Sequence, residues 1–408
     1  MPKTELFKKF FSYVNFINAT IGFESYGRYN KKTKYTKYLT KIIFYFNICN
    51  MFVIMLCEIL NLFLSSSTFV NIPDFFMSMA YVGFITNSSW KVYMIWKNRS
   101  IIEECIAGLY RIYPENLELQ MEYKVDVYLR QCQRFSKFMV FLFTFGIWFF
   151  NLLAFSQYLI SWKILHASDP QQELPYFIYT PWNWRGHWSY YLLYALESMA
   201  GHTSAMGNVS NDLLLVALIS QIVMHFDYVA NTMAGYQGME FTARRVGKTT
   251  PKRVLEFVKY FIEYHCYLLS LSDQLNDIFG ILLFVHFVST SLVICLLGFL
   301  VTIGTSALNI FKLCVFLFTL LIQSAFICYH GQLLMDASIK VSRGIFTNDW
   351  LKAEIKCQKM LILMTKRAQK PVQLKATTFI WISQGTMTVL LQMSYKFFTL
   401  LRTMYVKN

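Results

Sequence analysis

Long apolar stretches recur along the chain and alternate with polar segments. Seven of them reach the length of about 20 residues that an α-helix needs to cross a bilayer. They cover residues 42–64, 69–96, 137–161, 189–224, 279–303, 307–329 and 378–401. The fourth stretch carries several internal polar residues, but its length fits a span. The pattern predicts an all-α, polytopic membrane protein with seven transmembrane helices.

The composition agrees with this pattern. Of the 408 residues, 55% are hydrophobic and 15% are charged, whereas a soluble globular domain carries about 25% charged residues. Such an apolar chain is not disordered. Its length and its nine unpatterned cysteines also exclude a small secreted module held together by disulfides.

The basic residues predict an orientation. With seven spans, 30 of the 38 Lys and Arg residues lie in the N-terminal tail and three connections on one face, against 4 on the other. Basic segments stay cytoplasmic, so we expect the N-terminus inside and the C-terminus outside. The net charge of +15 is then mostly topological and suits contact with anionic membrane lipid. Because the charges are dispersed beside the spans, we expect no nucleic-acid partner.

Two polar connections on the cytoplasmic face have apolar residues at helical spacing, over 254–271 and 332–364. They predict amphipathic helices. Such helices either lie on the inner leaflet or pack subunits together, and the pattern leaves both open. On the opposite face, the connection 162–188 is rich in Trp and Pro and predicts a semi-rigid lid at the membrane interface.

The last apolar stretch carries a line of polar side chains on one face of about 120°. Buried polar groups in a membrane normally face a partner or water, so this face either bonds to another helix or lines an aqueous pore. Three acids also lie within predicted spans, where each has a functional or a buried structural role. The polar line comprises Gln384, Thr388, Gln392, Lys396, Thr399 and Thr403, and the acids are Glu58, Glu197 and Asp212.

Catalytic signatures are missing. The sequence has no Cys-x-x-Cys, His-Glu-x-x-His or Gly-x-Ser-x-Gly motif, and its histidines are not paired at metal-ligand spacing. Gly247-Lys248-Thr249 lacks the upstream glycine of a phosphate-binding loop. We therefore expect no enzyme activity, no cofactor and no metal. A transporter is disfavoured by the lack of a visible repeat, and a G-protein-coupled receptor by the inverted orientation.

The C-terminal third resembles the insect odorant receptor family. Residues 364–371, Met-Thr-Lys-Arg-Ala-Gln-Lys-Pro, look like the Arg-Ala-Gln-Lys-Pro segment that precedes the family's last span. Residues 394–402, Ser-Tyr-Lys-Phe-Phe-Thr-Leu-Leu-Arg, are similar to its terminal Ser-Tyr-x-Tyr/Phe-Phe-Thr-Leu-Leu pattern, and Trp350 matches an aromatic position. The Thr-Tyr…Gln-Phe ending typical of the related gustatory receptors is absent. The fourth-to-fifth connection is shorter than in the shared co-receptor, which indicates a ligand-tuning subunit.

This resemblance implies a subunit of a ligand-gated, non-selective cation channel in the plasma membrane of olfactory sensory neurons. It implies a small volatile odorant as ligand and a heterotetramer with the co-receptor. The alternatives are a gustatory-type chemoreceptor channel, a metabotropic receptor and a transporter. The expected organisation is a cytoplasmic N-terminal segment, six spans with the ligand pocket, a cytoplasmic anchor helix, and a pore-lining seventh span with an extracellular tail. These parts cover 1–41, 42–329, 330–377 and 378–408.

The resemblance also places the sites by depth in the membrane. The pocket is expected in the outer halves of the second, third, fourth and sixth spans, and the gate at or near Leu400. The pocket candidates are Phe75, Phe76, Met79, Trp148, Asn151, Phe155, Tyr190, Tyr194, Ser198, His202, Phe311, Lys312 and Val315. The pore and gate candidates are Gln392, Lys396, Thr399, Leu400 and Thr403.

Overall fold

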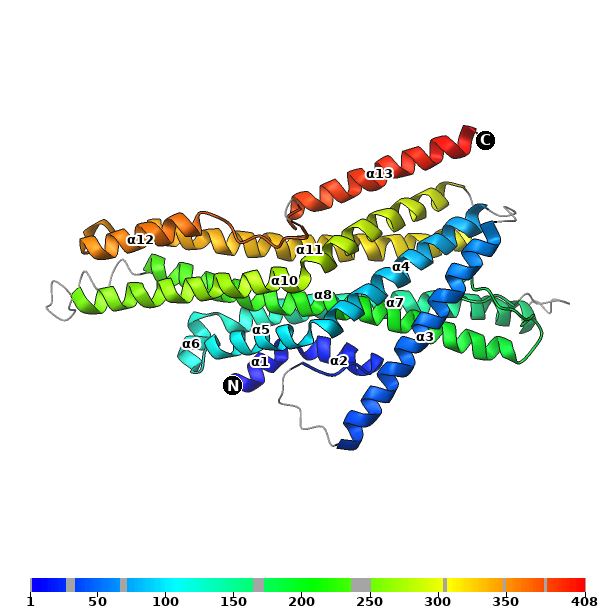
Figure 1. Cartoon of the computed structure of the whole chain (residues 1–408), viewed down its shortest axis with the longest axis horizontal. Coiled ribbons are helices and arrows are strands. Elements are labelled where there is room, and N and C mark those ends of the chain that lie inside the picture. Colours follow the sequence, from blue (N-terminus) through cyan, green and yellow to red (C-terminus); the bar gives the residue numbers. More distant parts are fainter. Residues whose placement is uncertain are drawn as a thin grey trace.

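The described part of the chain is almost wholly helical, and its longest helices run side by side (Figure 1). Its only β-structure is an isolated bridge between Lys375 and Trp381. This computed structural model describes residues 2–26, 34–66, 72–163, 172–235, 251–303, 307–347, 350–377 and 380–407. The prediction of an all-α membrane protein is confirmed.

Six of the seven predicted spans lie in helices over their described residues, and the seventh does so from Gln384 onward, since residues 380–383 are not helical. Residues 69–71 and 378–379 of the predicted spans fall outside the described residues. The helices are α3 (Lys34–Ser66), α4 (Ile72–Lys97), α7 (Val125–Lys163), α8 (Ser189–Gly235), α10 (Pro251–Ile303), α11 (Ala307–Phe346) and α13 (Gln384–Lys407). By length and composition, α3, α7, α8, α10 and α11 are apolar enough to cross a membrane. In their described residues, α4 and α13 do not reach the same hydropathy.

The shorter helices are α1 (Lys3–Phe10), α2 (Ser12–Ile21), α5 (Arg99–Ile112), α6 (Leu117–Glu122), the 3-10 helix η1 (Trp350–Lys352) and α12 (Ile355–Ala368). The helices α1 and α2 pack on α7, and α2 also packs on α8. Towards the left end in Figure 1, α12 packs on α10 and α11, and α5 and α6 lie nearby. This end of the molecule is therefore a helical assembly beyond the apolar spans.

The two predicted amphipathic segments are largely helical, and both begin inside long helices that also contain a predicted span. Residues 254–271 are the first part of α10, which continues without a break to Ile303. The second segment, 332–364, is split between two helices: α11 continues to Phe346, and α12 begins at Ile355. Neither α10 beyond its first residue nor α11 contains a proline, so no residue interrupts their hydrogen bonds. The long helices therefore extend the bundle instead of lying flat beneath it.

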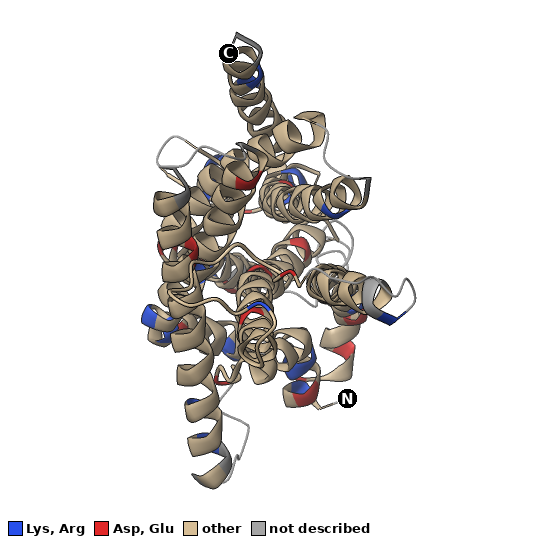
Figure 2. Cartoon of the chain, turned by 90° about the vertical axis from the view of Figure 1, so that its right-hand side faces the viewer, with Lys and Arg blue, Asp and Glu red and all other residues tan. Residues whose placement is uncertain are grey.

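The helix α8 forms the centre of the bundle. It packs against α3, α4, α7, α10 and α11. In its most apolar window 89% of residues are buried within the chain, compared with 28% in α3 and in α7. Figure 2, a view along the bundle, shows other helices surrounding the centre, with α13 standing apart on one side. The polar residues of the fourth span are thus enclosed by protein, where they can be paired.

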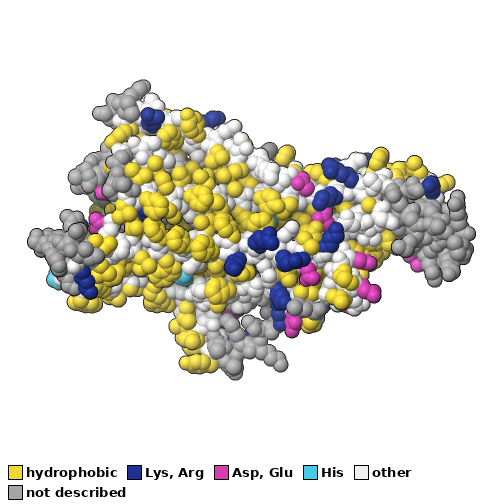
Figure 3. All heavy atoms as spheres, turned by 180° about the vertical axis from the view of Figure 1, so that it is seen from behind, with side chains coloured by type: hydrophobic (Ala, Val, Ile, Leu, Met, Phe, Trp, Pro, Cys, Tyr) yellow, Lys and Arg dark blue, Asp and Glu magenta, His cyan; other side chains and the backbone are white. Residues whose placement is uncertain are grey.

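The surface divides along the long axis. Figure 3 shows hydrophobic side chains covering most of one half of the molecule, with charged side chains gathered on the other half. The apolar half includes exposed residues of α7 such as Phe141 and Phe145. An apolar surface of this extent marks contact with lipid or with another protein.

The last helix is joined to the bundle by a linker whose described residues are 369–377 and 380–383. Its backbone bonds to α10 and α11: the Lys375 N–H donates to Asn276 Oδ1 (2.9 Å), and the Val372 N–H donates to Ser338 Oγ (2.9 Å). Further along, the hydroxyls of Ser291 on α10 and Ser394 on α13 lie 3.1 Å apart. The helix α13 therefore has fixed contacts at its start and near its middle.

Candidate ligand-binding site

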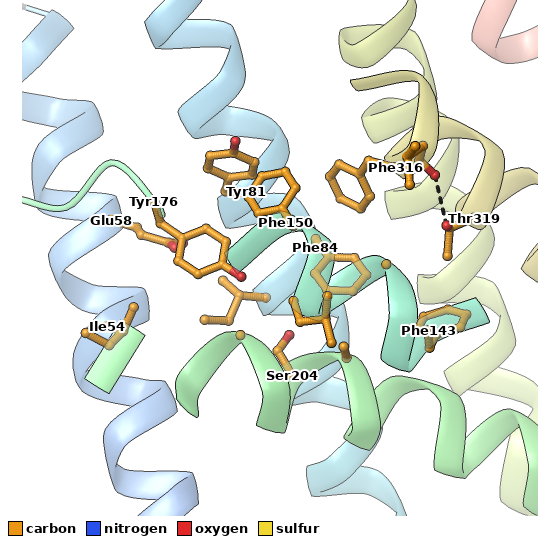
Figure 4. A pocket seen from close by; sticks show the side chains of 16 residues that line it. Ile54, Glu58, Tyr81, Phe84, Phe143, Phe150, Tyr176, Ser204, Phe316 and Thr319 are labelled. Atoms are coloured by element: carbon orange, nitrogen blue, oxygen red, sulfur yellow. Dashed lines mark hydrogen bonds between the residues drawn. The ribbon is translucent and has the colours of Figure 1, made fainter. Parts of the chain in front are cut away.

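A cavity lies where five helices meet, and its walls are mostly aliphatic and aromatic (Figure 4). It encloses about 720 Å³ of space not filled by protein atoms, open solvent included. Its lining comes from α3 (Ile54, Glu58), α4 (Tyr81, Phe84, Ile85), α7 (Phe143, Gly146, Ile147, Phe150), α8 (Gly201, Ser204, Ala205), α11 (Val315, Phe316, Thr319) and the connection before α8 (Tyr176). Concave apolar sites with few polar groups bind small organic molecules.

Aromatic rings hold the walls of this cavity together. Tyr81 meets Phe150 and Tyr176 edge-on, at centroid distances of 5.5 and 5.4 Å. Phe150 and Tyr176 stack at 5.7 Å, and Phe84 meets Phe316 edge-on at 5.3 Å. Such pairs stabilise a defined arrangement beyond the area they bury. The cavity therefore has a preformed aromatic wall.

Tyr176 enters the bundle from the connection between α7 and α8. Its N–H donates to Glu197 Oε2 (3.0 Å), and its hydroxyl donates to Asn151 Oδ1 (3.0 Å). Gly201 leaves room for the ring, because a Cβ atom there would overlap the Tyr176 hydroxyl. Burial, with smaller effects from nearby acids such as Glu58, raises the pKa of Tyr176 well above its ordinary value. The phenol therefore stays protonated and remains a donor.

Three polar groups of the lining have no partner among the described residues: the Tyr81 hydroxyl, the Glu58 carboxyl oxygen Oε2 and the Ser204 hydroxyl. The Glu58 side chain is only 2% exposed, and neither its Oε2 nor the Ser204 Oγ makes a hydrogen bond there. The two side chains approach from different sides, Glu58 from α3 and Ser204 from α8 (Figure 4). Buried polar groups are normally paired, so these two atoms and the Tyr81 hydroxyl are free to contact a ligand.

Of the thirteen pocket candidates from the sequence, Val315 lines this cavity. Asn151 does not line the cavity, but it accepts a hydrogen bond from Tyr176, which does. Asn151 also donates from Nδ2 to the Ser198 carbonyl (3.3 Å), and its own carbonyl accepts a short hydrogen bond from Tyr194. The Phe155 N–H donates to the same Tyr194 hydroxyl (3.2 Å). These candidates form a cluster between α7 and α8 next to the cavity.

The remaining candidates lie elsewhere. Trp148 lies 5.9 Å from the ring of His202 and lines a shallow groove on the outer face of α7. Tyr190 is buried and donates to the Glu173 carbonyl (3.2 Å). Lys312 lies over the ring of Phe150, with Nζ 3.8 Å from the centroid.

Four candidates fall near the ends of α4 and α11. Phe75 contacts Phe76, which packs edge-on against Phe299 at 5.1 Å. Met79 and Phe311 are exposed on the isolated chain. None of these four lines the cavity.

A buried ion pair connects α4 and α8 away from the cavity. Lys91 Nζ lies 2.6 Å from Asp212 Oδ1 and 2.7 Å from Asn208 Oδ1. Gln323 on α11 donates to Asn208 Oδ1 and to the other carboxylate oxygen, Asp212 Oδ2. The Lys91 and Asp212 side chains are 0% and 2% exposed. Asp212, one of the three acids expected in spans, therefore has a structural partner.

The pore candidates lie on a face of α13 that the rest of the chain leaves uncovered. Gln392, Lys396, Leu400 and Thr403 are exposed, and Thr399 is half-buried. The Thr399 and Thr403 hydroxyls bond to backbone carbonyls one turn earlier, at 2.8 and 2.7 Å. The polar line is thus not used for packing within this chain.

The geometry of an aromatic cavity within a long-helix bundle can be compared with known proteins. The sequence profile of the family described as 7tm Odorant receptor matches residues 71–395. The chain belongs to this odorant receptor family. The resemblance read from the C-terminal motifs is confirmed, as is the expectation that this receptor is not an enzyme.

Individual relatives cover the whole receptor. Odorant receptor 85c of Drosophila melanogaster is 38% identical over 399 residues, which cover 98% of this chain and all of the relative. Odorant receptor 85b of the same fly is 36% identical over 401 residues, with the same coverage. The match along both chains makes this protein a multi-pass odorant receptor.

Solved structures share the fold. The insect olfactory receptor OR5 from Machilis hrabei superposes with a TM-score of 0.80, covering 98% of each chain at 13% identity. The same receptor in complex with eugenol gives a TM-score of 0.79. At this identity the similarity concerns the arrangement of helices.

Proposed function

We propose that this receptor binds a small volatile odorant in the cavity between α3, α4, α7, α8 and α11. It thereby opens a non-selective cation channel in the plasma membrane of olfactory sensory neurons. The observation that carries the proposal is a preformed aromatic cavity, almost without polar groups, inside a chain of the odorant receptor family. A volatile molecule has mostly apolar surface, which such walls remove from water.

The cavity and α13 have a physical connection through α11. Val315, Phe316 and Thr319 line the cavity near the start of α11. Farther along the same helix, Gly331 contacts the backbone of Ile382, in the linker that leads into α13. An odorant opens the channel only if it binds the open arrangement more tightly than the closed one. A shift of α11 on binding would reach the start of α13 directly.

In the proposed channel, α13 lines the ion path and Leu400 forms the gate. A ring of apolar side chains closes a pore by excluding water, and Leu400 is 57% exposed in the isolated chain. Four copies of Lys396 around one pore would repel cations. We therefore favour a heterotetramer in which co-receptor subunits supply other copies of this helix.

The proposed topology follows the basic residues. The N-terminal segment up to residue 41 and the anchor region 330–377 lie in the cytoplasm, and the C-terminus lies outside. The charged half of the surface in Figure 3 supports this arrangement, since it coincides with the end that carries α12.

The test is a substitution that fills the cavity with a larger side chain. We expect Val315→Trp to reduce or abolish currents evoked by an odorant panel, and to change the ranking of odorants, because the larger side chain occupies the site. Currents are recorded from cells expressing the receptor with the co-receptor, together with surface labelling. The matched control is Phe318→Trp on the same helix, which is exposed and outside the cavity. An unchanged ranking for Val315→Trp would contradict the proposed site.

A further inference from the structure

The cavity has a polar feature that points to a class of ligand. Resting on the proposed function, we propose that this receptor selects odorants that carry a hydroxyl group, and that Glu58 is the side chain that hydrogen-bonds this hydroxyl. The helix of the first predicted span, α3, then takes part in ligand recognition through Glu58 and Ile54, both of which line the cavity.

The three acids within the spans differ in one respect. Asp212 is paired with Lys91 at 2.6 Å, and Glu197, fully buried, accepts the Tyr176 N–H at 3.0 Å. Glu58 is equally buried, but among the described residues its Oε2 has no donor and no Lys or Arg forms an ion pair with it. Glu197 Oε1 also lacks a partner among the described residues, but Glu197 and Asp212 do not line the cavity. Of these acids, Glu58 is therefore the one that can offer an unpartnered oxygen to a ligand there.

The position of Glu58 directs that capacity into the cavity. Its side chain extends from α3 towards Tyr176, whose own hydroxyl is already bonded to Asn151 (Figure 4). Around it the lining is aliphatic and aromatic, with the unpartnered Ser204 hydroxyl on the α8 side. A carboxyl group left without a partner in such surroundings is costly. A ligand that brings one hydrogen bond to Glu58 removes this cost.

A hydroxyl fits this carboxyl better than other volatile groups do. It donates to a carboxylate and also accepts from a protonated carboxyl, so it pairs with Glu58 in either state. An ether or aldehyde only accepts, and leaves an ionised carboxylate unpaired. An ammonium ion would first have to leave water, which largely offsets the attraction of a buried ion pair. The remaining walls favour a small apolar skeleton around the hydroxyl.

The experiment uses matched ligands and variants of Glu58. Currents are recorded from the receptor with its co-receptor, using the alcohol, methyl ether, aldehyde and amine built on hexyl, cyclohexylmethyl and phenylethyl skeletons. For each skeleton that activates, the ratio of half-maximal concentrations for ether and alcohol is compared among wild type, Glu58→Leu and Glu58→Gln. Leu60→Met, on an exposed position of the same helix, is the matched control.

We expect the wild type to prefer the alcohol on at least one skeleton. Glu58→Leu should reduce this preference about tenfold, because a lost hydrogen bond to a charged or buried group is worth about that factor. Glu58→Gln, which retains an acceptor and a donor, should keep the preference within about threefold. Leu60→Met should leave it unchanged, and responses to the ether should survive in every variant.

The outcomes separate this inference from the proposed function. If the wild type prefers the aldehyde, the ether or the amine, or if no alcohol opens the channel, the hydroxyl inference is overturned. It is also overturned if Glu58→Leu leaves the preference intact. In these cases the cavity remains the odorant site as long as Val315→Trp still changes the ranking of odorants. If Val315→Trp has no effect either, the proposed function fails as well.

Discussion

Single charged residues in this receptor form buried interactions, and these matter for stability because the charges are shielded from water. Lys91, Asp212 and Asn208 meet in the interior, where neither charge can reach water. A buried ion pair is often no more stable than an apolar replacement of both partners, but removal of one partner leaves a buried charge without compensation. The pair therefore fixes the position of α4 against α8. Removing one of its two charges would lower the free energy of unfolding.

This leads to a prediction about paired substitutions. Lys91→Met alone should destabilise the receptor by about 3–5 kcal/mol and lower its surface expression. The double variant Lys91→Met with Asp212→Leu should recover most of the loss. Thermal unfolding of the purified protein in detergent, with surface labelling, measures both. If the double variant is as unstable as the sum of the two single ones, the two residues do not act as a pair.

For single residues, the sequence predicted which side chains have unusual chemistry better than it predicted which side chains line the cavity. It singled out Glu58, Glu197 and Asp212, because acids inside apolar stretches are costly and rarely accidental. It placed the pocket by depth alone, and depth does not tell which side of a helix faces inward. One cavity residue, Tyr176, comes from a connection, where no periodicity indicates that a side chain turns back into the bundle.

Whole helices in this receptor approach one another closely where glycine allows it. A Cβ atom on Gly344 of α11 would overlap the carbonyl oxygen of Ala230 on α8. Small residues let membrane helices pack backbone to backbone. The contact lies near the ends of both helices, beyond the cavity, and holds α11 against the central helix.

We predict that Gly344→Ala destabilises the receptor by about 1–3 kcal/mol, since backbone atoms cannot move aside as a side chain can. A matched control is Gly235→Ala on α8, where a Cβ atom would meet nothing within 4 Å. The control should be neutral or slightly stabilising, because alanine favours a helix. Thermal unfolding measurements check both variants, and equal behaviour of the two would contradict the close contact.

The helices themselves were predictable from the sequence, whereas their continuity was not. Six predicted spans lie in helices over their described residues and the seventh does so from Gln384 onward, because about 20 apolar residues in a row have few other stable arrangements. The amphipathic segment 254–271 and the fifth span belong to one helix, since α10 runs through both without interruption. A change from apolar to amphipathic composition alters what surrounds a helix, and it does not end the helix.

On the scale of the whole molecule, the distribution of charge is the feature that predicts topology. Lys and Arg are concentrated on one predicted face of the sequence, and charged side chains gather on one half of the folded surface (Figure 3). We expect an epitope tag at the N-terminus to be stained only after permeabilisation, and a tag at the C-terminus to be stained on intact cells. Staining of both tags on the same side would contradict an odd number of crossings.

The length of α11 has a mechanical consequence. From Thr319, at the cavity, to Phe346, at its end, this helix runs for about 40 Å at 1.5 Å per residue, without a proline that could act as a hinge. If an odorant tilted the helix by about 5°, its far end would be displaced by roughly 3.5 Å, and α8, which Gly344 contacts at that end, would move with it. A molecule of a few carbon atoms could thus change the spacing between subunits well below the bilayer, without any rearrangement of the helix itself.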